Sequence, residues 1–293
     1  VINKHNVTIK GLNPGMRSNI DVNGINDLLG PGGGSKLVAR NAEAAIKVET
    51  GMKGVKIMNL MVSGGTEAKN IGIHFVGATD NGMLSNIIGI NLHTGVKIEQ
   101  AKNMQIVNCW VCELPNSIEL IGGENIVVKN CQLGAQPTGI TCKVQEVNKL
   151  SFINNQVYPD GRENLVLDAC DNCVIEGNNF KSYYNGILVL NGNDNTVNKN
   201  IFWLTGAVQN QLLDHGDDFG IINVKGNNNM VASNSLSCEW AYAGAVTVNA
   251  VQGTGNVFKN CFVDNLESYR VFLVNAQTEV SNCVSSDKVS IVE

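Results

Sequence analysis

The stretch that decides the fold is GILVLNGNDNTVNKN, residues 186–200. Aliphatic residues alternate through its first half, as in a β-strand with one buried side, and Asn and Gly fill the turn that follows. The stretch GVKIEQAKNMQIVN, residues 95–108, has the same plan. Two such stretches in one chain indicate a repeating unit of short strands and polar turns.

Asn residues that end strand-like runs reveal the period of the repeat. They stand at positions 108, 130, 154, 178, 200, 234, 260 and 282, so the successive spacings are 22, 24, 24, 22, 34, 26 and 22 residues. A period of this size, with three short strands in each unit, is typical of a parallel β-helix. Equivalent side chains of neighbouring coils then lie about 4.8 Å apart, which lets Asn hydrogen-bond to Asn along the axis. We therefore predict an all-β fold, a right-handed single-stranded parallel β-helix (solenoid).

The repeat also predicts how the chain is divided. It covers most of the 293 residues, so we expect a single parallel β-helix domain over residues 1–293. The 34-residue spacing implies a loop insertion at about 203–220, and insertions in solenoids commonly form the binding face. Because strand-like sequence begins almost at Val1, we expect that an N-terminal segment with a signal peptide is missing. The protein is then secreted or periplasmic, in a bacterium.

Composition excludes several classes of function. Hydrophobic residues make up 43% of the chain and charged residues 16%, which is typical of a globular protein. The formal net charge is −5 and no run of Lys or Arg occurs, so we expect no nucleic-acid partner. No apolar stretch reaches 18 residues, so we expect no membrane-spanning helix and no membrane partner.

The nine cysteines follow the repeat. Cys109, Cys131, Cys261 and Cys283 each come directly after an Asn. Cysteines that recur at one point of a repeat are better explained as stacked small apolar residues than as disulfides. The pairs Cys109/Cys112 and Cys170/Cys173 have metal-ligand spacing, but no His lies near them. We therefore predict no metal site.

Two sets of acidic residues suggest polysaccharide chemistry but lack partners. The stretch HGDDFG (215–220) supplies Asp217 and Asp218, as in polygalacturonases, without the other Asp, His, Arg and Lys residues of that site. The stretch YPDGRENLVLDACDN contains Asp160, Arg162, Asp168 and Asp171, as in pectate lyases. A calcium site needs oxygen ligands from several segments, and only one is visible. On this reading the acidic residues are turn-forming or surface groups.

A third set is the pair Glu113 and Glu119 in NCWVCELPNSIEL, residues 108–120. Glycosyl chemistry needs one group that protonates the departing glycosidic oxygen and a second that deprotonates the attacking hydroxyl or itself attacks. Glu119 lies between Ile118 and Leu120, so it points outward if those two point to the core. A solvated Glu on the outside of a strand is the simpler interpretation of these residues alone.

Several blocks, in one order, resemble the inulin fructotransferases, a family that includes the difructose anhydride III hydrolases. The blocks are GLNPGMRSNIDVN (11–23), NSIELIGGENIVV (116–128), LGAQPTGIT (133–141), YPDGR (158–162), CDNC (170–173) and DDFGIINVKGNNN (217–229). The resemblance implies a homotrimer with active sites between subunits and no cofactor. It also implies release of the terminal difructosyl unit of inulin, a β-2,1-linked fructan, as cyclic difructose anhydride III. Hydrolysis of that anhydride is the other activity of the family.

The resemblance places the catalytic general acid at Glu119 and further family positions at Arg17, Arg162, Asp217 and Asp218, which we predict to bind substrate. Asp160 stands where the family has a basic residue, and we predict that it binds substrate too. The second catalytic residue of the family, an Asp, falls on Asn108. An amide is not basic near pH 7, so Asn108 cannot act as a general base. We hypothesise that Glu113 replaces the missing Asp. The alternative is a β-helix that binds glycans without turning them over.

Overall fold

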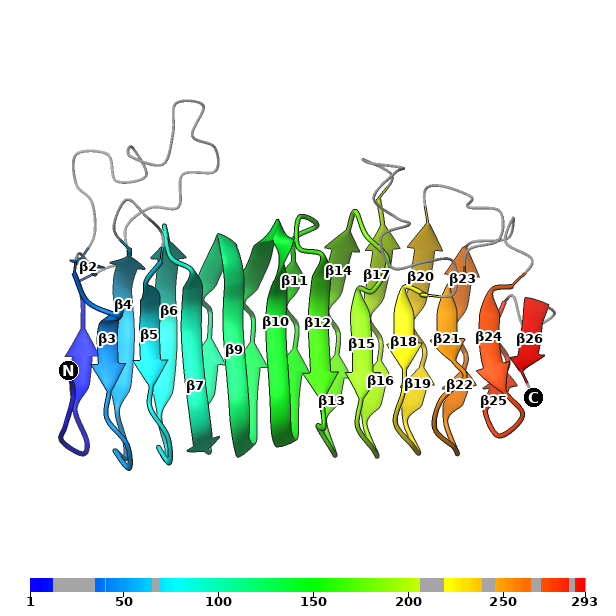
Figure 1. Cartoon of the computed structure of the whole chain (residues 1–293), viewed down its shortest axis with the longest axis horizontal. Helices are drawn as coiled ribbons and strands as arrows, with labels where there is room; N and C mark the ends of the chain where they lie inside the picture. The colour runs from blue at the N-terminus through cyan, green and yellow to red at the C-terminus, as the bar shows by residue number, and fades with distance from the viewer. Residues whose placement is uncertain are drawn as a thin grey trace.

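The structure, a computed structural model, describes residues 1–12, 35–39, 41–64, 69–205, 219–238, 246–264, 270–284 and 288–292. These residues form 26 β-strands that pair in parallel and make one continuous sheet. Figure 1 shows the coils stacked side by side along one axis, with the two termini at opposite ends. The predicted parallel β-helix is therefore confirmed.

Each coil has three strand positions, which we name faces A, B and C in chain order. Face A contains β1 (Thr8–Lys10), β8 (Gln105–Val107), β13 (Val174–Glu176), β16 (Thr196–Asn198), β19 (Met230–Ala232), β22 (Val257–Lys259) and β25 (Glu279–Ser281). Face B contains β2 (Lys36–Val38), β11 (Gln156–Val157), β14 (Asn179–Ser182), β17 (Ile201–Leu204), β20 (Ser235–Cys238) and β23 (Phe262–Asp264).

Face C carries the candidate site. It contains β3 (Ala44–Val48), β5 (Ile71–Phe75), β7 (Thr94–Lys102), β12 (Glu163–Asp168), β15 (Leu188–Asn191), β18 (Ile222–Val224), β21 (Val248–Ala250), β24 (Phe272–Asn275) and β26 (Val289–Val292). Four long strands bend around corners and connect the faces. β4 (Lys56–Ser63) and β6 (Met83–Ile90) pass from A to B, whereas β9 (Trp110–Lys129) and β10 (Gln132–Ile153) pass from B through C to A.

The corner between faces A and B explains the repeating Asn residues. Its residues have left-handed backbone, with φ between 52° and 68°, and they are Asn59, Asn86, Asn108, Asn130, Asn154, Gly177, Lys199, Ser233, Asn260 and Asn282. Asn adopts this conformation more readily than most residues, and Gly adopts it freely. The next residue of each coil points into the core. The sequence period therefore mixes two neighbouring rows, because Asn178, Asn200 and Asn234 belong to the buried row.

That buried row is a hydrogen-bonded ladder. The Nδ2 atom of Asn178 donates to Oδ1 of Asn200 at 2.9 Å and to the carbonyl of Phe152 at 2.8 Å. The Oδ1 atom of Asn178 in turn accepts from the backbone N–H and Nδ2 of Asn155. Buried amides that pair with each other in this way leave no unsatisfied polar group. The predicted Asn ladder is present, in this row.

Cysteines occupy the two ends of the same row. Cys109 and Cys131 precede the Asn ladder, and Cys261 and Cys283 follow it; all four are buried. All nine cysteines of the chain are free thiols. The prediction that the four cysteines of this row are stacked core residues is confirmed, and a thiol fills the space of an apolar side chain there without needing an amide's hydrogen bonds.

The longest coil is confirmed by the ladder itself, since Asn200 pairs with Asn234, 34 residues later. Strand β17 continues through Leu204, so residues 203 and 204 belong to a strand and the insertion begins after them. Residues 206–218 lie outside the described ranges. Along the chain, the additional residues follow β17 on face B and precede β18 on face C. In the part of the chain that the structure describes, no helix has the length and apolarity to span a membrane.

Candidate active site

Glu119 lies on the outer side of face C. Its neighbours Ile118 and Leu120 are buried in the core, whereas Glu119 itself is half-buried and faces outward, as the alternation predicts. Parallel pairing places Glu119 between Lys97 of β7 and Lys143 of β10. Adjacent strands are about 4.8 Å apart, so this carboxylate lies between two ammonium-bearing side chains of the neighbouring coils.

One of these lysines belongs to a network of charged side chains. The ammonium group of Lys97 donates to Oε1 of Glu99 at 2.8 Å. His74, which is only 5% exposed, lies between Glu99 and Glu43, with nitrogen–oxygen distances of 3.6 and 3.7 Å. Through these contacts His74 of β5 and Lys97 of β7 hold the Glu99 carboxylate on the outer side of face C.

The network fixes the ionisation of its central pair. The hydrogen bond from Lys97 lowers the pKa of Glu99, and His74 adds to this effect. The hydrogen bond to Glu99 raises the pKa of Lys97, and the negative charge of Glu119 contributes further. Near neutral pH, Glu99 is therefore an ionised carboxylate and Lys97 a charged ammonium group.

Glu99 is the carboxylate that sequence reasoning missed. Lys97 pairs with Glu119, so Glu99 lies one coil before Glu119 and two residues further along its strand. Parallel-sheet geometry puts the Cα atoms of the two glutamates about 8 Å apart. The repeat contained the information needed, because aligning GVKIEQ (95–100) with SIELIG (117–122) places both glutamates on the outer side of one face.

The structure does not bring Asn108 to Glu119 within one chain. Asn108 is exposed at the corner between faces A and B, where its φ is 56° and its N–H donates to the carbonyl of Lys129 at 3.1 Å. The face B portion of β9 separates this corner from Glu119 on face C. The local structure accounts for Asn108 as one of the left-handed corner residues.

Glu113 lies at the corner between faces B and C. It is exposed, its φ is 63°, and its carbonyl accepts a hydrogen bond of 3.2 Å from Nε2 of Gln136. The pairing of β9 with β10 is irregular here, because Leu114 rather than Glu113 is opposite Ala135. This corner borders face C, six residues before Glu119 in the chain.

Asp160 and Arg162 lie on the same B–C edge, directly before β12. Nε of Arg162 is 3.9 Å from the carboxylate of Glu163, the first residue of that strand. Desolvation raises the pKa of Glu163, and the positive charge of Arg162 partly opposes it. Asp160 is an exposed residue, and partial desolvation raises the pKa of its carboxyl group. The predicted residues Arg17, Asp217 and Asp218 lie outside the described residues.

Cys170 and Cys173 of the second Cys-x-x-Cys motif are buried free thiols. Burial raises the pKa of the Cys170 thiol to about 11 and that of Cys173 to about 12, so both are protonated near neutral pH. Across the described ranges, no group of three or more His, Cys, Asp or Glu side chains is arranged to hold a metal ion. The charged groups around Glu119 on the outer side of face C are carboxylates and lysines, which suit acid–base chemistry.

A family comparison agrees with this architecture. The family described as "right handed beta helix region" matches residues 138–291, more than half of the chain. The chain belongs to this family. A comparison of this right-handed β-helix with curated proteins finds no match.

Solved structures similar to this right-handed β-helix include several of DFA-IIIase from Arthrobacter chlorophenolicus A6. The form without its lid has a TM-score of 0.82 and 21% identity, covering 100% of this chain and 82% of that one. The complex with GF2 has a TM-score of 0.80 and 20% identity, with coverage of 100% and 82%. The A-module of the mannuronan C-5 epimerase AlgE6 from Azotobacter vinelandii has a TM-score of 0.60 and 9% identity, with coverage of 85% and 80%. The resemblance seen in the sequence is thus confirmed as a shared fold.

Proposed function

We propose that this protein is a fructan-active enzyme in which Glu119 donates the proton to the departing glycosidic oxygen. The supporting observation is that the whole chain superposes on DFA-IIIase, while Glu119 faces outward on face C. Structures of that neighbour hold GF2 and DFA-III. These ligands favour a fructose oligosaccharide, or a fructose disaccharide, as the substrate here.

In this proposal Glu99 is the second carboxylate. Acid–base glycosyl chemistry works when two groups on one site differ in their readiness to hold a proton. Lys97 keeps Glu99 ionised, the form in which a carboxylate can accept a proton from the attacking hydroxyl. A Cα separation of about 8 Å is compatible with carboxyl groups about 6.5–9.5 Å apart, the spacing that leaves room for an attacking group between them.

The leading reaction is intramolecular. A hydroxyl of the terminal difructosyl unit attacks the anomeric carbon, the bond to the rest of inulin breaks, and the product is difructose anhydride III. Glu119 gives its proton to the leaving oxygen and Glu99 takes one from the attacking hydroxyl, so no cofactor enters the balance. Hydrolysis of difructose anhydride III is the second candidate, favoured by the similarity to DFA-IIIase; water is then the attacking group.

The test is product identity. Purified protein is incubated separately with inulin and with difructose anhydride III, and products are resolved by anion-exchange chromatography. The anhydride from inulin supports the transferase, and a linear difructose from the anhydride supports the hydrolase. Either activity should be lost in Glu119→Gln. Binding of both compounds with no product from a folded protein would contradict the enzymatic proposal and favour a non-catalytic glycan-binding β-helix.

We also propose a homotrimer. A solenoid with three broad faces can bury one face around a three-fold axis, so that each subunit meets two copies of itself. Asn108 and Glu119 point in different directions, so position 108 reaches a Glu119 site only if it comes from a neighbouring subunit. Light scattering at micromolar concentration measures the mass directly. A monomer would overturn the trimer and leave the pair of Glu99 and Glu119 unaffected.

A further inference from the structure

A pocket of about 220 Å³ lies on the outer side of face C, beside the candidate site. Its residues come from β10, β12, β15 and the turn after β18, and Lys143 is one of them. Lys143 is also the direct neighbour of Glu119 on the next strand. The pocket therefore continues the face C surface from Glu119 along the solenoid axis.

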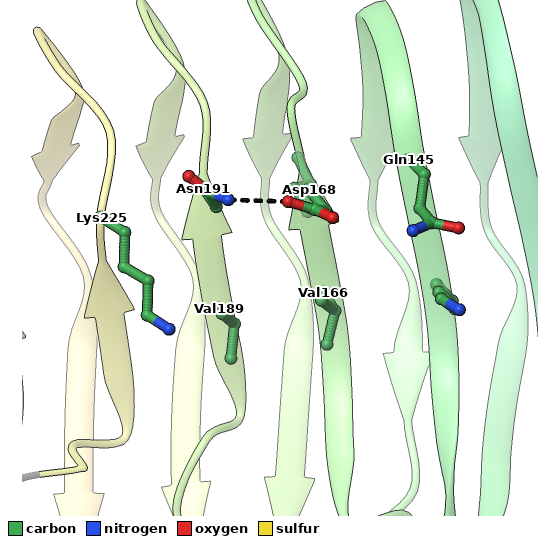
Figure 2. A pocket seen from close by; sticks show the side chains of 8 residues that line it. Gln145, Val166, Asp168, Val189, Asn191 and Lys225 are labelled. Atoms are coloured by element: carbon green, nitrogen blue, oxygen red, sulfur yellow. Dashed lines mark hydrogen bonds between the residues drawn. The ribbon is translucent and has the colours of Figure 1, made fainter.

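Two valines form the floor of this pocket. Val166 and Val189 are paired on adjacent strands and occupy the row that carries Glu119 and Lys143 in the preceding coils. Both are half-buried and face outward, where charged residues stand in those coils. In Figure 2 the two side chains lie side by side on the outer surface of the sheet. They offer a small apolar surface of the kind that contacts the C–H face of a ring.

Polar groups border the valines on one side. Asn191 donates a hydrogen bond of 2.7 Å to Oδ1 of Asp168, and Figure 2 shows this pair directly above the valines. The amide of Gln145 continues the same row, because Gln145 pairs with Asp168. Lys225 extends along the face toward Val189. The hydrogen bond orients Asp168, so its second carboxylate oxygen is available to accept from a ligand hydroxyl.

These observations select a class of ligand. An apolar floor edged by a carboxylate, amides and ammonium groups matches a sugar ring, which has one apolar face and hydroxyls around its rim. The charges around the floor are of both signs, Asp168 against Lys143 and Lys225, so it is the apolar floor that favours a neutral ligand. A volume of about 220 Å³ lies below the roughly 300–1,000 Å³ of pockets that hold drug-sized molecules, so one sugar unit fits better than several.

We propose that this pocket binds one neutral sugar unit of a fructan chain whose reacting unit lies at Glu119, since its floor is two to three coils further along the same row. The inference rests on the proposed function and extends it to substrate length. A substrate that continues beyond the reacting unit occupies both positions, whereas difructose anhydride III occupies only the position at Glu119. The protein then binds a fructan trisaccharide more tightly than the cyclic disaccharide, and the difference depends on Asp168 and Lys225.

The experiment measures binding in the Glu119→Gln background, so that bound substrate persists. Isothermal titration calorimetry compares a β-2,1-linked fructan trisaccharide with difructose anhydride III. Asp168→Asn and Lys225→Met should each weaken trisaccharide binding about tenfold, the effect of one lost hydrogen bond to a charged group. Affinity for the disaccharide should stay within twofold. Asp171→Asn and Lys129→Met are the matched controls, since both residues lie outside the pocket, and thermal unfolding checks that every variant is folded.

The outcomes separate the two proposals. Equal trisaccharide affinity in the pocket variants and the controls overturns the pocket as a sugar site, whatever the activity of the wild type. Tighter binding of an oligouronate than of the trisaccharide, lost in Lys225→Met, overturns the neutral ligand class. Pocket-dependent trisaccharide binding supports the inference even if the wild-type protein releases no product, and in that case only the enzymatic proposal fails.

Discussion

The buried Asn ladder and the outer side of face C are built by the same repetition but differ in what they repeat. In the ladder the same amide returns in successive coils, from Asn155 to Asn234, and each copy satisfies the next. On face C the row through Glu119 differs in chemistry between coils, from lysine to glutamate to lysine and then to two valines. Repetition inside stabilises the solenoid, whereas variation outside creates a site whose groups differ in charge and polarity.

The sharpest way to test this comparison is to remove the second carboxylate from the outer row. Glu99→Gln should lower kcat about 10³-fold, within the range for a lost general base, because an amide cannot accept the proton. Glu113→Gln is the matched control and should retain activity, since Glu113 lies at the corner before face C. Rates are measured on whichever fructan substrate the wild type converts.

The reverse pattern would restore the hypothesis drawn from the sequence. Full activity in Glu99→Gln, together with loss in Glu113→Gln, would show that the bend at Leu114 aims Glu113 into the site. Equal thermal unfolding of both variants is needed for either conclusion, because Glu99 also forms an ion pair with Lys97.

Breaking the inner ladder should affect stability instead of chemistry. Asn178→Ala removes the acceptor of the backbone N–H and Nδ2 of Asn155 and the side-chain donor to the carbonyl of Phe152, all inside the core. Buried polar groups without partners destabilise by about 1–3 kcal/mol each, so we expect a loss of at least about 3 kcal/mol. Urea denaturation measures it.

The corner row supplies the control for the ladder. Asn130 is exposed and left-handed, with φ 55°, so Asn130→Gly keeps the backbone unstrained and should change stability by less than about 0.5 kcal/mol. Similar losses in Asn178→Ala and Asn130→Gly would mean that the corner conformation, and not the buried amides, holds neighbouring coils together.

The difference between the two regions also explains what the sequence could predict. The Asn ladder and the cysteine row could be predicted, because identical residues that recur at a similar spacing can be recognised in the sequence alone. The outward position of Glu119 could be predicted from its apolar neighbours, whereas the role of Glu99 could not. The nearness of Glu99 to Glu119 depends on the pairing of Lys97 with Glu119 between neighbouring coils. A period that varies from 22 to 34 residues does not predict which residues are paired. The same uncertainty merged the exposed and buried Asn rows into one series.

The ion pair on face C should contribute a smaller, pH-dependent stabilisation. The pKa of Glu99 is lowered from its ordinary value of 4.5, so the contribution is present above that pH and is lost as the pH falls through the lower folded-state pKa. The pKa of Lys97 is raised from 10.5, so the contribution is complete below that pH and is lost as the pH rises through the higher folded-state pKa.

The measurement compares the wild type with Lys97→Met. The variant should be less stable by about 0.5–1 kcal/mol at pH 7, the size of a partly exposed ion pair, and the difference should shrink as the pH falls well below 4.5. Chemical denaturation at several pH values gives both numbers. A difference that does not change with pH would assign the effect to packing of the lysine stem and not to its charge.

The smallest expected effect is at the residue that first put the activity in doubt. Asn108→Asp restores the carboxylate that the resemblance places there, but at a corner of the chain that does not share a face with Glu119. If Glu99 is the working partner, the rate should change by less than about twofold, because a solvent-exposed charge in another part of the chain is screened. A tenfold gain would mean that a neighbouring subunit brings its own corner residue to face C. That result would make the trimer part of the catalytic site, and the Asn at position 108 would then be what limits the rate.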